Sequence, residues 1–342
     1  MSKPHLPPDL VEKLESQNID QEKLVGQKKL TVMFVDLRGF SIILEKMNAK
    51  SVLKILDIYF RMIASIVNEY NGIVDKYIGD GLMAVWGLPQ ESTADVYKAI
   101  CTAIEIRTGM FRLLPELVKI GVVPLETGIG IATGMAVAGF VGPPLRRDFT
   151  LIGQCINRAD RLQSIASNNR VFTDENTKVE ILPYSYLIKI PKTSHTTVLP
   201  DEEIYEMEGI YEFDMEHDSK RKHPRVKVAK VGGITQLSSQ QRKAALIKSI
   251  SEGGLGIEIH DLEDFTLGVG EEVVIDSKTF GLMSNQEARG LIVRKTELSG
   301  GGIFRIKTWD IGIKALNLSE AIKGKLHKMS LQKNSAVKYL NR

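Results

Sequence analysis

Hydrophobic and polar positions follow two different periods along the first half of the chain, and each change of period marks the end of an element. The apolar run "LTVMFVD" at 30–36 is rich in β-branched residues and precedes a glycine, so it predicts a short strand. Apolar residues at three- and four-residue spacing over 49–70 predict an amphipathic helix that ends at an Asn-Gly pair. A β-hairpin over 73–86 and a second helix from about 93 to 114 follow.

A further strand, "LETGIGIAT", precedes a glycine-spaced stretch, a polar turn and a helix that starts near Gln154. Strand, helix, hairpin, helix and strand in this order predict an α+β fold with a ferredoxin-like βαββαβ core. In such a core the end of the first strand and the tip of the hairpin lie at the same edge of the sheet. We therefore expect Asp36 and Asp80 to meet.

The hairpin tip also has a purely structural interpretation. Asp-Gly is a common two-residue hairpin turn, because both central residues take positive φ, which Asp tolerates and Gly adopts freely. Asp80 and Gly81 are then turn residues, and Lys76 is a solvated strand residue. The short charged stretch at 9–29 is a candidate for a dimer-aligning helix, although it is brief for a coiled coil.

The second half of the chain changes character. An acidic and then strongly basic stretch, "DMEHDSKRKHPRVKVAK", reaches residue 230 and is typical of a segment that connects two domains. Short alternating runs separated by glycines continue to about residue 318, and this spacing predicts a small antiparallel β-barrel.

Composition narrows the functional classes. The length of 342 residues and the hydrophobic fraction of 43% favour two globular domains. The net charge of only +3 gives no global sign of a nucleic-acid polymer as partner. Cys101 and Cys155 have no metal-like spacing, so the chain suits a reducing compartment. The first residues lack the apolar run of a secretory signal, and we find no segment for membrane insertion. We expect a cytoplasmic protein.

Candidate chemistry gathers in the α+β domain. Asp36 and Asp80 supply hard oxygen ligands of the kind that a two-metal phosphoryl-transfer site needs, although strand-end aspartates often only cap turns. Asn157 and Arg161 are four residues apart and share one helix face. An amide that orients a ribose and a guanidinium that binds a phosphate suit that face, whereas Arg158 and Asp160 indicate spare surface charge.

Four stretches in succession resemble the class III adenylate/guanylate cyclase catalytic domain: "FVDLRGFS", "DKYIGDGLMAVWG", "TGIGIATGMAVAGFVG" and "DFTLIGQCINRADRL". The resemblance covers roughly residues 28–213. It implies that Asp36 and Asp80 bind two metal ions, Mg²⁺ or Mn²⁺, near the backbone of Leu37. It also implies that Asn157 orients the ribose and that Arg161 stabilises the α-phosphate during catalysis.

The same resemblance assigns the purine contacts to Lys76 and Thr150. Adenylate cyclases have lysine at the first position, where it donates to adenine N1, whereas guanylate cyclases usually have glutamate. Threonine at the second position is typical of a bacterial subgroup similar to bicarbonate-responsive enzymes. The family also has a lysine that holds the terminal phosphates, and Lys189 and Lys192 both remain candidates. The implied reaction converts ATP to cyclic AMP and pyrophosphate in a head-to-tail homodimer with composite sites.

The barrel resembles the PilZ domain, which binds cyclic di-GMP. Arg221 and Arg225 fit the family's Arg-x-x-x-Arg segment, and Ser251 and Gly254 in "SISEGGLGI" fit its Asp/Asn-x-Ser-x-x-Gly segment. Ser249 stands where the family has Asp or Asn, and this departure bears on affinity or on the choice of ligand. The resulting organisation is a lead segment at 1–27, a cyclase domain at 28–213, a linker at 214–219, a PilZ-like domain at 220–325 and a basic tail at 326–342.

The leading hypothesis is thus an adenylate cyclase regulated by cyclic di-GMP. One alternative is a catalytically silent cyclase-like protein that acts as a cyclic di-GMP receptor through a partner. Another is a guanylate cyclase, or a relative of the diguanylate cyclases. Lys76 counts against the former, and the missing Gly-Gly-Asp/Glu-Glu-Phe signature counts against the latter.

Overall fold

The computed structural model describes residues 5–122, 125–143, 145–182, 184–191, 199, 202–211, 225–261, 267–276, 288–298, 307–318, 320 and 322–329. The chain forms two compact units. The first comprises Met1–Ile106, Pro124–Leu182 and Leu187–Met207, and the second comprises Arg107–Val123, Pro183–Tyr186 and Glu208–Arg342. The predicted linker at 214–219 and the end of the tail, 330–342, lie outside the described residues. No helix among the described residues is long and apolar enough to cross a membrane.

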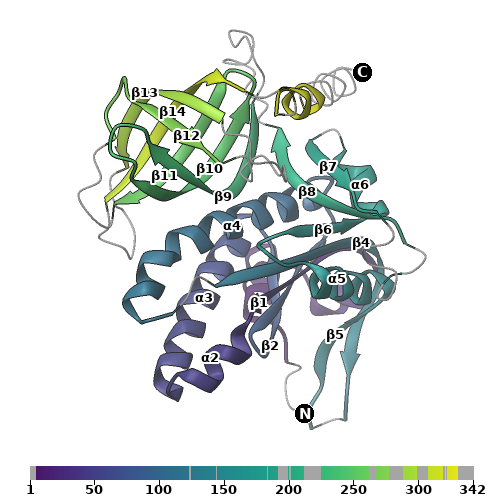
Figure 1. Cartoon of the computed structure of the whole chain (residues 1–342). Helices are drawn as coiled ribbons and strands as arrows, with labels where there is room; N and C mark the ends of the chain where they lie inside the picture. The colour runs from purple at the N-terminus through teal and green to yellow at the C-terminus, as the bar shows by residue number, and fades with distance from the viewer. Residues whose placement is uncertain are drawn as a thin grey trace. The chain divides into compact units, whose positions relative to one another are not determined.

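The first unit is built on a twisted sheet with helices packed against it (Figure 1). Its strands run in the order β8-β6-β4-β1-β3-β2, with β5 beside β4 and β7 beside β8. The strands are β1 (Gly26–Arg38), β2 (Ile73–Ile78), β3 (Gly81–Trp86), β4 (Glu126–Val141), β5 (Asp148–Ile152), β6 (Val171–Asp174), β7 (Ser185–Lys189) and β8 (Ile204–Tyr211). The helices are α1 (Pro8–Ser16), the 3₁₀ helix η1 (Gln21–Leu24), α2 (Phe40–Lys46), α3 (Ala49–Glu69), α4 (Asp95–Lys119), α5 (Gln154–Ile165) and α6 (Glu175–Ile181). Three of these elements cross the division between the units: α4 from Arg107 onward, β7 up to Tyr186 and β8 from Glu208 onward belong to the second unit.

The predicted ferredoxin-like core is confirmed. Strand β1, helix α3, the β2–β3 hairpin, helix α4 and strand β4 follow one another, and the sheet order β4-β1-β3-β2 is that of this core. The strand "LETGIGIAT" and the glycine-spaced stretch after it form one long strand, β4, whereas the short helix α2 was not predicted. The lead segment belongs to this unit's own core, since Leu10, Leu14 and Leu24 are buried there.

The glycines of β4 have a packing role. Strand residues two apart point to the same face, and Gly128 and Gly130 lie beneath α5. A methyl group on Gly130 would lie 2.1 Å from the Ala159 carbonyl oxygen, and one on Gly128 would lie 2.4 Å from that of Ala166. The Gly-x-Gly spacing therefore allows the α5 backbone to lie almost directly on the sheet.

The hairpin turn differs from the sequence prediction by one residue. Ile78 pairs with Gly81, so the two loop residues are Gly79 and Asp80. Gly79 has φ +63°, and Asp80 is not among the residues with positive φ. Glycine at the first loop position is typical of a type II′ turn. The turn therefore does not need a residue at position 80 that tolerates a left-handed backbone. Turn geometry alone does not explain why an aspartate stands there.

The second unit contains a closed six-stranded antiparallel barrel, as the sequence predicts. Each strand pairs with two others in the cycle β9-β10-β11-β14-β13-β12-β9. The strands are β9 (Val226–Gln236), β10 (Arg242–Ser251), β11 (Gly254–Asp261), β12 (Glu272–Ile275), β13 (Ala288–Leu298) and β14 (Lys307–Asn317). Residues 322–329 are helical, so the helix continues past the predicted domain boundary at 325. The fully buried Glu258 accepts two hydrogen bonds from Arg112 of the same unit, at 2.8 and 2.9 Å.

The close approach of α5 to β4 predicts that the fold does not tolerate a side chain at Gly130. Replacing Gly130 with Ala should lower the free energy of unfolding by about 2–3 kcal/mol, because the new methyl group forces the helix away from the sheet. Gly139→Ala, on the same strand, is the matched control, since the nearest atom to its Cβ would be 4.0 Å away. Urea unfolding of both variants measures the difference. Equal stability would contradict this account of the glycines.

Candidate functional site

The structure brings Asp36 and Asp80 to one edge of the sheet. Asp36 lies near the end of β1, and Asp80 lies in the neighbouring β2–β3 loop. A Cβ on Gly81, the residue directly after Asp80, would lie 2.9 Å from Asp36 Oδ1. The glycine thus leaves room for the first carboxylate beside the second.

Asp36 is held by two residues that the sequence analysis did not single out. Gln163 of α5 donates from Nε2 to Asp36 Oδ2 at 3.2 Å, and Arg38 Nη1 lies 3.6 Å from the same oxygen. Arg38 also donates to the carbonyl oxygens of Gln163 and Ala166 at the end of α5. Arg38 could be found from the sequence, because it follows Asp36 by two residues on a strand and strand residues two apart share a face. Nothing in the sequence indicated Gln163.

The environment of Asp36 favours its neutral form. Burial raises the pKa of this carboxyl group, and the negative charge of Asp80 raises it further. Arg38, Gln163 and the Leu37 backbone amide act in the opposite direction and lower this pKa. Two carboxylates close together in a half-buried site repel each other, and a cation between them would relieve the repulsion.

These residues fit a divalent metal site that is completed by its substrate. Among the described residues, no group of three or more His, Cys, Asp or Glu side chains is arranged to hold a metal. Mg²⁺ is nevertheless often held by one or two carboxylates together with substrate phosphates. Close by, the buried hydroxyl of Tyr59 has no hydrogen-bond partner in the described structure, and its pKa is raised by burial and by the charges of Asp36 and Asp80. Polar groups at this edge therefore remain available for a bound ion and its ligands.

Asn157 and Arg161 lie together at a pocket beside α5. The side chains around it are those of Gln154, Asn157, Arg158, Arg161, Leu199 and Glu202. Hydrogen-bond donors dominate this wall, which suits a polyanionic ligand. Asp36, Asp80, Lys76 and Thr150 are not among the residues that line it.

Arg158 is not the spare surface charge that the sequence suggested. Its side chain is largely buried and pairs with the buried Asp174, with Nη1 3.1 Å from Oδ2. Asp174 in turn accepts from the Thr177 amide and caps α6. Arg158 therefore fixes α5 to the β6–α6 junction while it lines the pocket.

The two residues that the resemblance assigns to the purine lie on different strands. Lys76 is on β2, half exposed, with Nζ 3.2 Å from Oδ2 of the buried Asp75. Thr150 is on β5, and its hydroxyl donates to the Asp148 carbonyl oxygen at 3.3 Å. Strands β3, β1 and β4 lie between β2 and β5, so a single sheet does not bring the two side chains together. Of the candidate phosphate lysines, Lys189 pairs with Glu203, and Lys192 lies outside the described residues.

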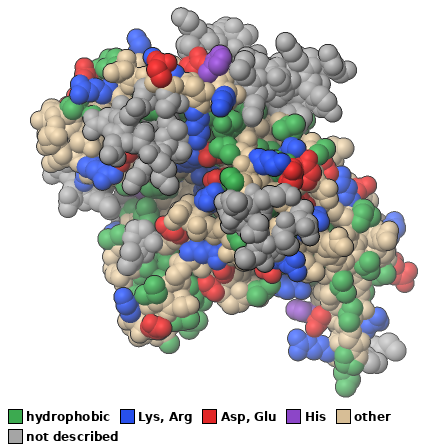
Figure 2. All heavy atoms as spheres, turned by 45° about the vertical axis from the view of Figure 1, so that its right-hand side comes forward, with side chains coloured by type: hydrophobic (Ala, Val, Ile, Leu, Met, Phe, Trp, Pro, Cys, Tyr) green, Lys and Arg blue, Asp and Glu red, His purple; other side chains and the backbone are tan. Residues whose placement is uncertain are grey.

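Thr150 lies on an exposed apolar face. Cross-strand neighbours in the β4–β5 arm share a face, and Gly139 pairs with Thr150 between apolar positions. Hydrophobic side chains run along the arm at the lower right of Figure 2. Those more than half exposed on this face are Met135, Val137, Val141 and Ile152. A contiguous apolar face of this kind marks an interaction surface.

In the barrel, three predicted ligand residues gather at one end of β9, β10 and β11. Val226 pairs with Ile250, and extending this register by one residue places Arg225 beside Ser251. Ser251 donates its hydroxyl to the Gly254 carbonyl oxygen at 3.2 Å across the tight turn. Gly254 has φ +152°, and a Cβ there would lie 1.9 Å from the Ile313 carbonyl oxygen, so only glycine fits. Arg221 lies outside the described residues.

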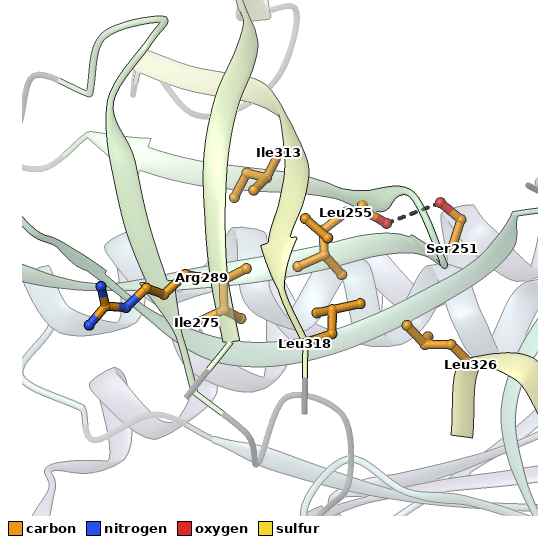
Figure 3. Close-up of a pocket in the computed structure, with 9 residues that line it drawn as sticks. Ser251, Leu255, Ile275, Arg289, Ile313, Leu318 and Leu326 are labelled. Atoms are coloured by element: carbon orange, nitrogen blue, oxygen red, sulfur yellow. Dashed lines mark hydrogen bonds between the residues drawn. The ribbon is translucent and has the colours of Figure 1, made fainter. Parts of the chain in front are cut away.

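An apolar pocket adjoins this turn. Figure 3 shows Leu255, Ile275, Ile313, Leu318 and Leu326 around it, whereas Arg289 points away. Leu326 belongs to the helical segment 322–329, and His327 of that segment lies 3.5 Å from Glu252 in the turn. Ser249, the residue that departs from the PilZ pattern, is buried, with its hydroxyl 2.6 Å from where a Cβ on Gly256 would lie.

Comparison with known proteins agrees with this geometry. The family model "Adenylate and Guanylate cyclase catalytic domain" matches residues 23–205, which is more than half of the chain. The chain belongs to the adenylate and guanylate cyclase catalytic domain family. A PilZ domain follows at residues 219–332.

Similar proteins are found for the cyclase domain. The uncharacterised protein Rv1320c of Mycobacterium tuberculosis is 33% identical over 150 residues, which are 44% of this chain and 25% of that protein. Rv1319c of the same organism is 30% identical over 151 residues, 44% of this chain and 27% of that protein. The matched region thus spans about a quarter of the length of these relatives.

Two solved structures resemble the same part of the chain. The adenylyl cyclase CyaB from P. aeruginosa has 29% identity and a TM-score of 0.51, and the match covers 54% of this chain and 95% of that one. The guanylyl cyclase Cya2 has 25% identity and a TM-score of 0.50, with coverage of 54% and 94%. The cyclase domain therefore resembles enzymes named for either purine.

The raised pKa of Asp36 predicts that this site destabilises the metal-free protein. The folded chain holds a proton on Asp36 more tightly than the unfolded chain does, so stability falls as pH rises from the ordinary carboxyl pKa through the raised pKa of Asp36, and the full cost is present above the raised pKa. Asp36→Asn removes this charge and should raise the Tm of the metal-free protein by about 1–3 °C at pH 7.5. Asp160→Asn, on the exposed face of α5, is the control. A lower Tm for Asp36→Asn would contradict this interpretation.

Proposed function

We propose that this cyclase family member is an adenylate cyclase, which converts ATP to cyclic AMP and pyrophosphate in a homodimer and is regulated by cyclic di-GMP bound to its PilZ domain. The observation that carries the proposal is the pair of carboxylates at one sheet edge, on a chain whose α5 lines a donor-rich pocket with Asn157 and Arg161. Asp36 and Asp80, with the backbone at Leu37, would hold two Mg²⁺ or Mn²⁺ ions. Such ions supply positive charge that lowers the energy of the transferring phosphate.

The side chains support an in-line displacement at phosphorus. The ribose 3′-oxygen attacks the α-phosphorus of ATP, its proton is released to solvent, and the bond to the pyrophosphate oxygen breaks. Asn157 orients the ribose, and Arg161 neutralises charge that grows on the α-phosphate. No side-chain nucleophile is required, because catalysis rests on positioning and on charge neutralisation.

The distribution of these residues supports a homodimer. The carboxylate pair is not among the residues that line the Asn157 and Arg161 pocket, so a single pocket does not contain both halves of the chemistry. The exposed apolar face of the β4–β5 arm offers a surface for a second copy. A head-to-tail dimer would bring the aspartates of one chain to the α5 pocket of the other and create two equivalent sites.

Lys76 supports ATP as the substrate. Its ammonium group can only donate hydrogen bonds, which suits N1 of adenine, an acceptor, whereas N1 and N2 of guanine are donors. The pair with Asp75 holds Lys76 at the β2 edge in this structure. Because the similar structures include both purine classes, this side chain is the basis for the choice.

A silent receptor for cyclic di-GMP is the second candidate, and the barrel supports it independently. Arg225, Ser251 and Gly254 gather at one barrel end whether or not the other unit is active. The two functions are separated by measuring turnover and ligand binding on the same purified protein.

The double variant Asp36→Ala/Asp80→Ala tests catalysis. It should lose cyclic AMP formation by more than about 10³-fold in the presence of Mg²⁺ or Mn²⁺, because no carboxylates remain to hold the ions. Circular dichroism checks that the variant is folded, and Asp57→Ala on the exposed side of α3 serves as a charge control. Measurable turnover by the folded double variant would refute the assignment.

Arg225→Ala tests the PilZ site. Cyclic di-GMP binding, measured by calorimetry on the full-length protein, should weaken at least about tenfold, because a guanidinium that pairs with phosphate and stacks on guanine is lost. Arg242→Ala, at the opposite end of β10, should leave the affinity unchanged. Equal affinities for the two variants would argue against a ligand site at the Arg225 end of the barrel.

A further inference from the structure

The pocket beside α5 contains a charge pair for which the proposed chemistry has no role. Arg158 lines the same pocket as Asn157 and Arg161 and lies one helical turn from Arg161, and Glu202 is also among the lining residues. Glu202 Oε2 is 2.5 Å from Arg158 Nε. The contact is nevertheless out of line with the N–H bond, because the buried Nε has no hydrogen-bond partner in the described part of the chain.

The Arg158 guanidinium is held by a hydrogen bond on one side, whereas its hydrogen bonding on the other side is poor. On one side Nη1 donates to Asp174, which is itself buried and caps α6. On the other side the Nε edge meets Glu202 in an arrangement that gives charge attraction without a good hydrogen bond. A buried donor in this state gains from an acceptor with better alignment.

Among the described residues that line this pocket, Glu202 is also the only carboxylate. The other polar side chains around it, those of Gln154, Asn157 and Arg161, all provide donors. A nucleotide triphosphate that enters the pocket brings several negative charges close to this carboxylate. Like charges at short range in a partly desolvated site repel strongly, so Glu202 opposes the ligand that the rest of the wall favours.

We propose that Glu202 occupies the position of a nucleotide phosphate against Arg158, and that Arg158 joins Arg161 in binding the phosphates once Glu202 moves aside. This inference rests on the proposed nucleotide site. It makes Arg158 a second phosphate-binding arginine and makes Glu202 a built-in competitor that sets the affinity for the nucleotide. A planar guanidinium that is already fixed by Asp174 loses little freedom on binding, which suits this role.

The test measures binding of adenosine 5′-(α,β-methylene)triphosphate, which cannot release pyrophosphate, to the full-length protein with Mn²⁺. Glu202→Gln removes the charge and keeps the shape, so it should tighten binding about 3–10-fold and lower KM for ATP by a similar factor. Arg158→Lys should weaken binding, because it keeps the charge and loses the Nε donor. Glu206→Gln, which breaks the Arg170–Glu206 pair outside the pocket, is the matched control and should not change the affinity.

The outcomes separate this inference from the function on which it rests. If the unmodified protein does not bind the analogue, the nucleotide site itself fails, and the role of Glu202 fails with it. If the protein binds the analogue but Glu202→Gln binds it equally or more weakly, the competitor role is overturned while the cyclase proposal stands. A purely structural ion pair predicts this weaker binding together with a lower Tm, whereas the competitor role predicts tighter binding.

Discussion

The arrangement of the first unit depends on how closely the backbone of α5 lies on β4. Gly128 and Gly130 have no side chains, and the carbonyl oxygens of Ala159 and Ala166 occupy the space that methyl groups would fill. This contact brings Gln163 within 3.2 Å of the Asp36 carboxylate. Arg38 then donates to the carbonyl oxygens of Gln163 and Ala166 at the end of α5, which ties the helix end to β1. A single packing constraint thus ties the carboxylate edge to the helix that carries Asn157 and Arg161.

Charge repulsion and buried polar groups without partners lower the stability of the fold at the places where we propose function. Asp36 and Asp80 repel each other at one edge, and the buried Tyr59 hydroxyl beside them has no partner among the described residues. Arg158 keeps a buried donor that Glu202 does not align with. Buried polar groups without a partner cost stability, and a bound ion, water or ligand that completes them is one explanation for their presence. Two of them, the Tyr59 hydroxyl and Arg158 Nε, lie at the carboxylate edge and in the α5 pocket, whereas others, such as His260 Nε2 and Trp309 Nε1, lie in the barrel unit.

Much of the fold could be predicted from the sequence because local patterns determine it. The period of the apolar residues located α3, α4 and α5, and the strand order followed from the βαββαβ succession. The carboxylate edge followed from the same topology. The sequence pattern predicts the hairpin turn one residue too late, because an Asp-Gly pair and a Gly-Asp pair are both plausible turns and only the register of Ile78 with Gly81 decides between them.

Contacts between residues far apart in the chain could not be predicted from the sequence. Gln163 reaches Asp36 across 127 positions, and the pairing of Arg158 with Asp174 and Glu202 depends on how α5 sits against β6 and on the chain around residue 202. Arg158 therefore looked like a surface charge on a polar helix face. The lead segment was similarly ambiguous, since a short amphipathic helix has the same pattern whether it covers its own core or a second copy.

The most direct test of the central claim is nucleotide turnover by the purified full-length protein, with ATP or GTP as substrate, in Mg²⁺ or Mn²⁺, with and without micromolar cyclic di-GMP. The account predicts cyclic AMP formation from ATP in strong preference to GTP, at a rate that changes when the dinucleotide is added. No turnover of ATP under any of these conditions would contradict it.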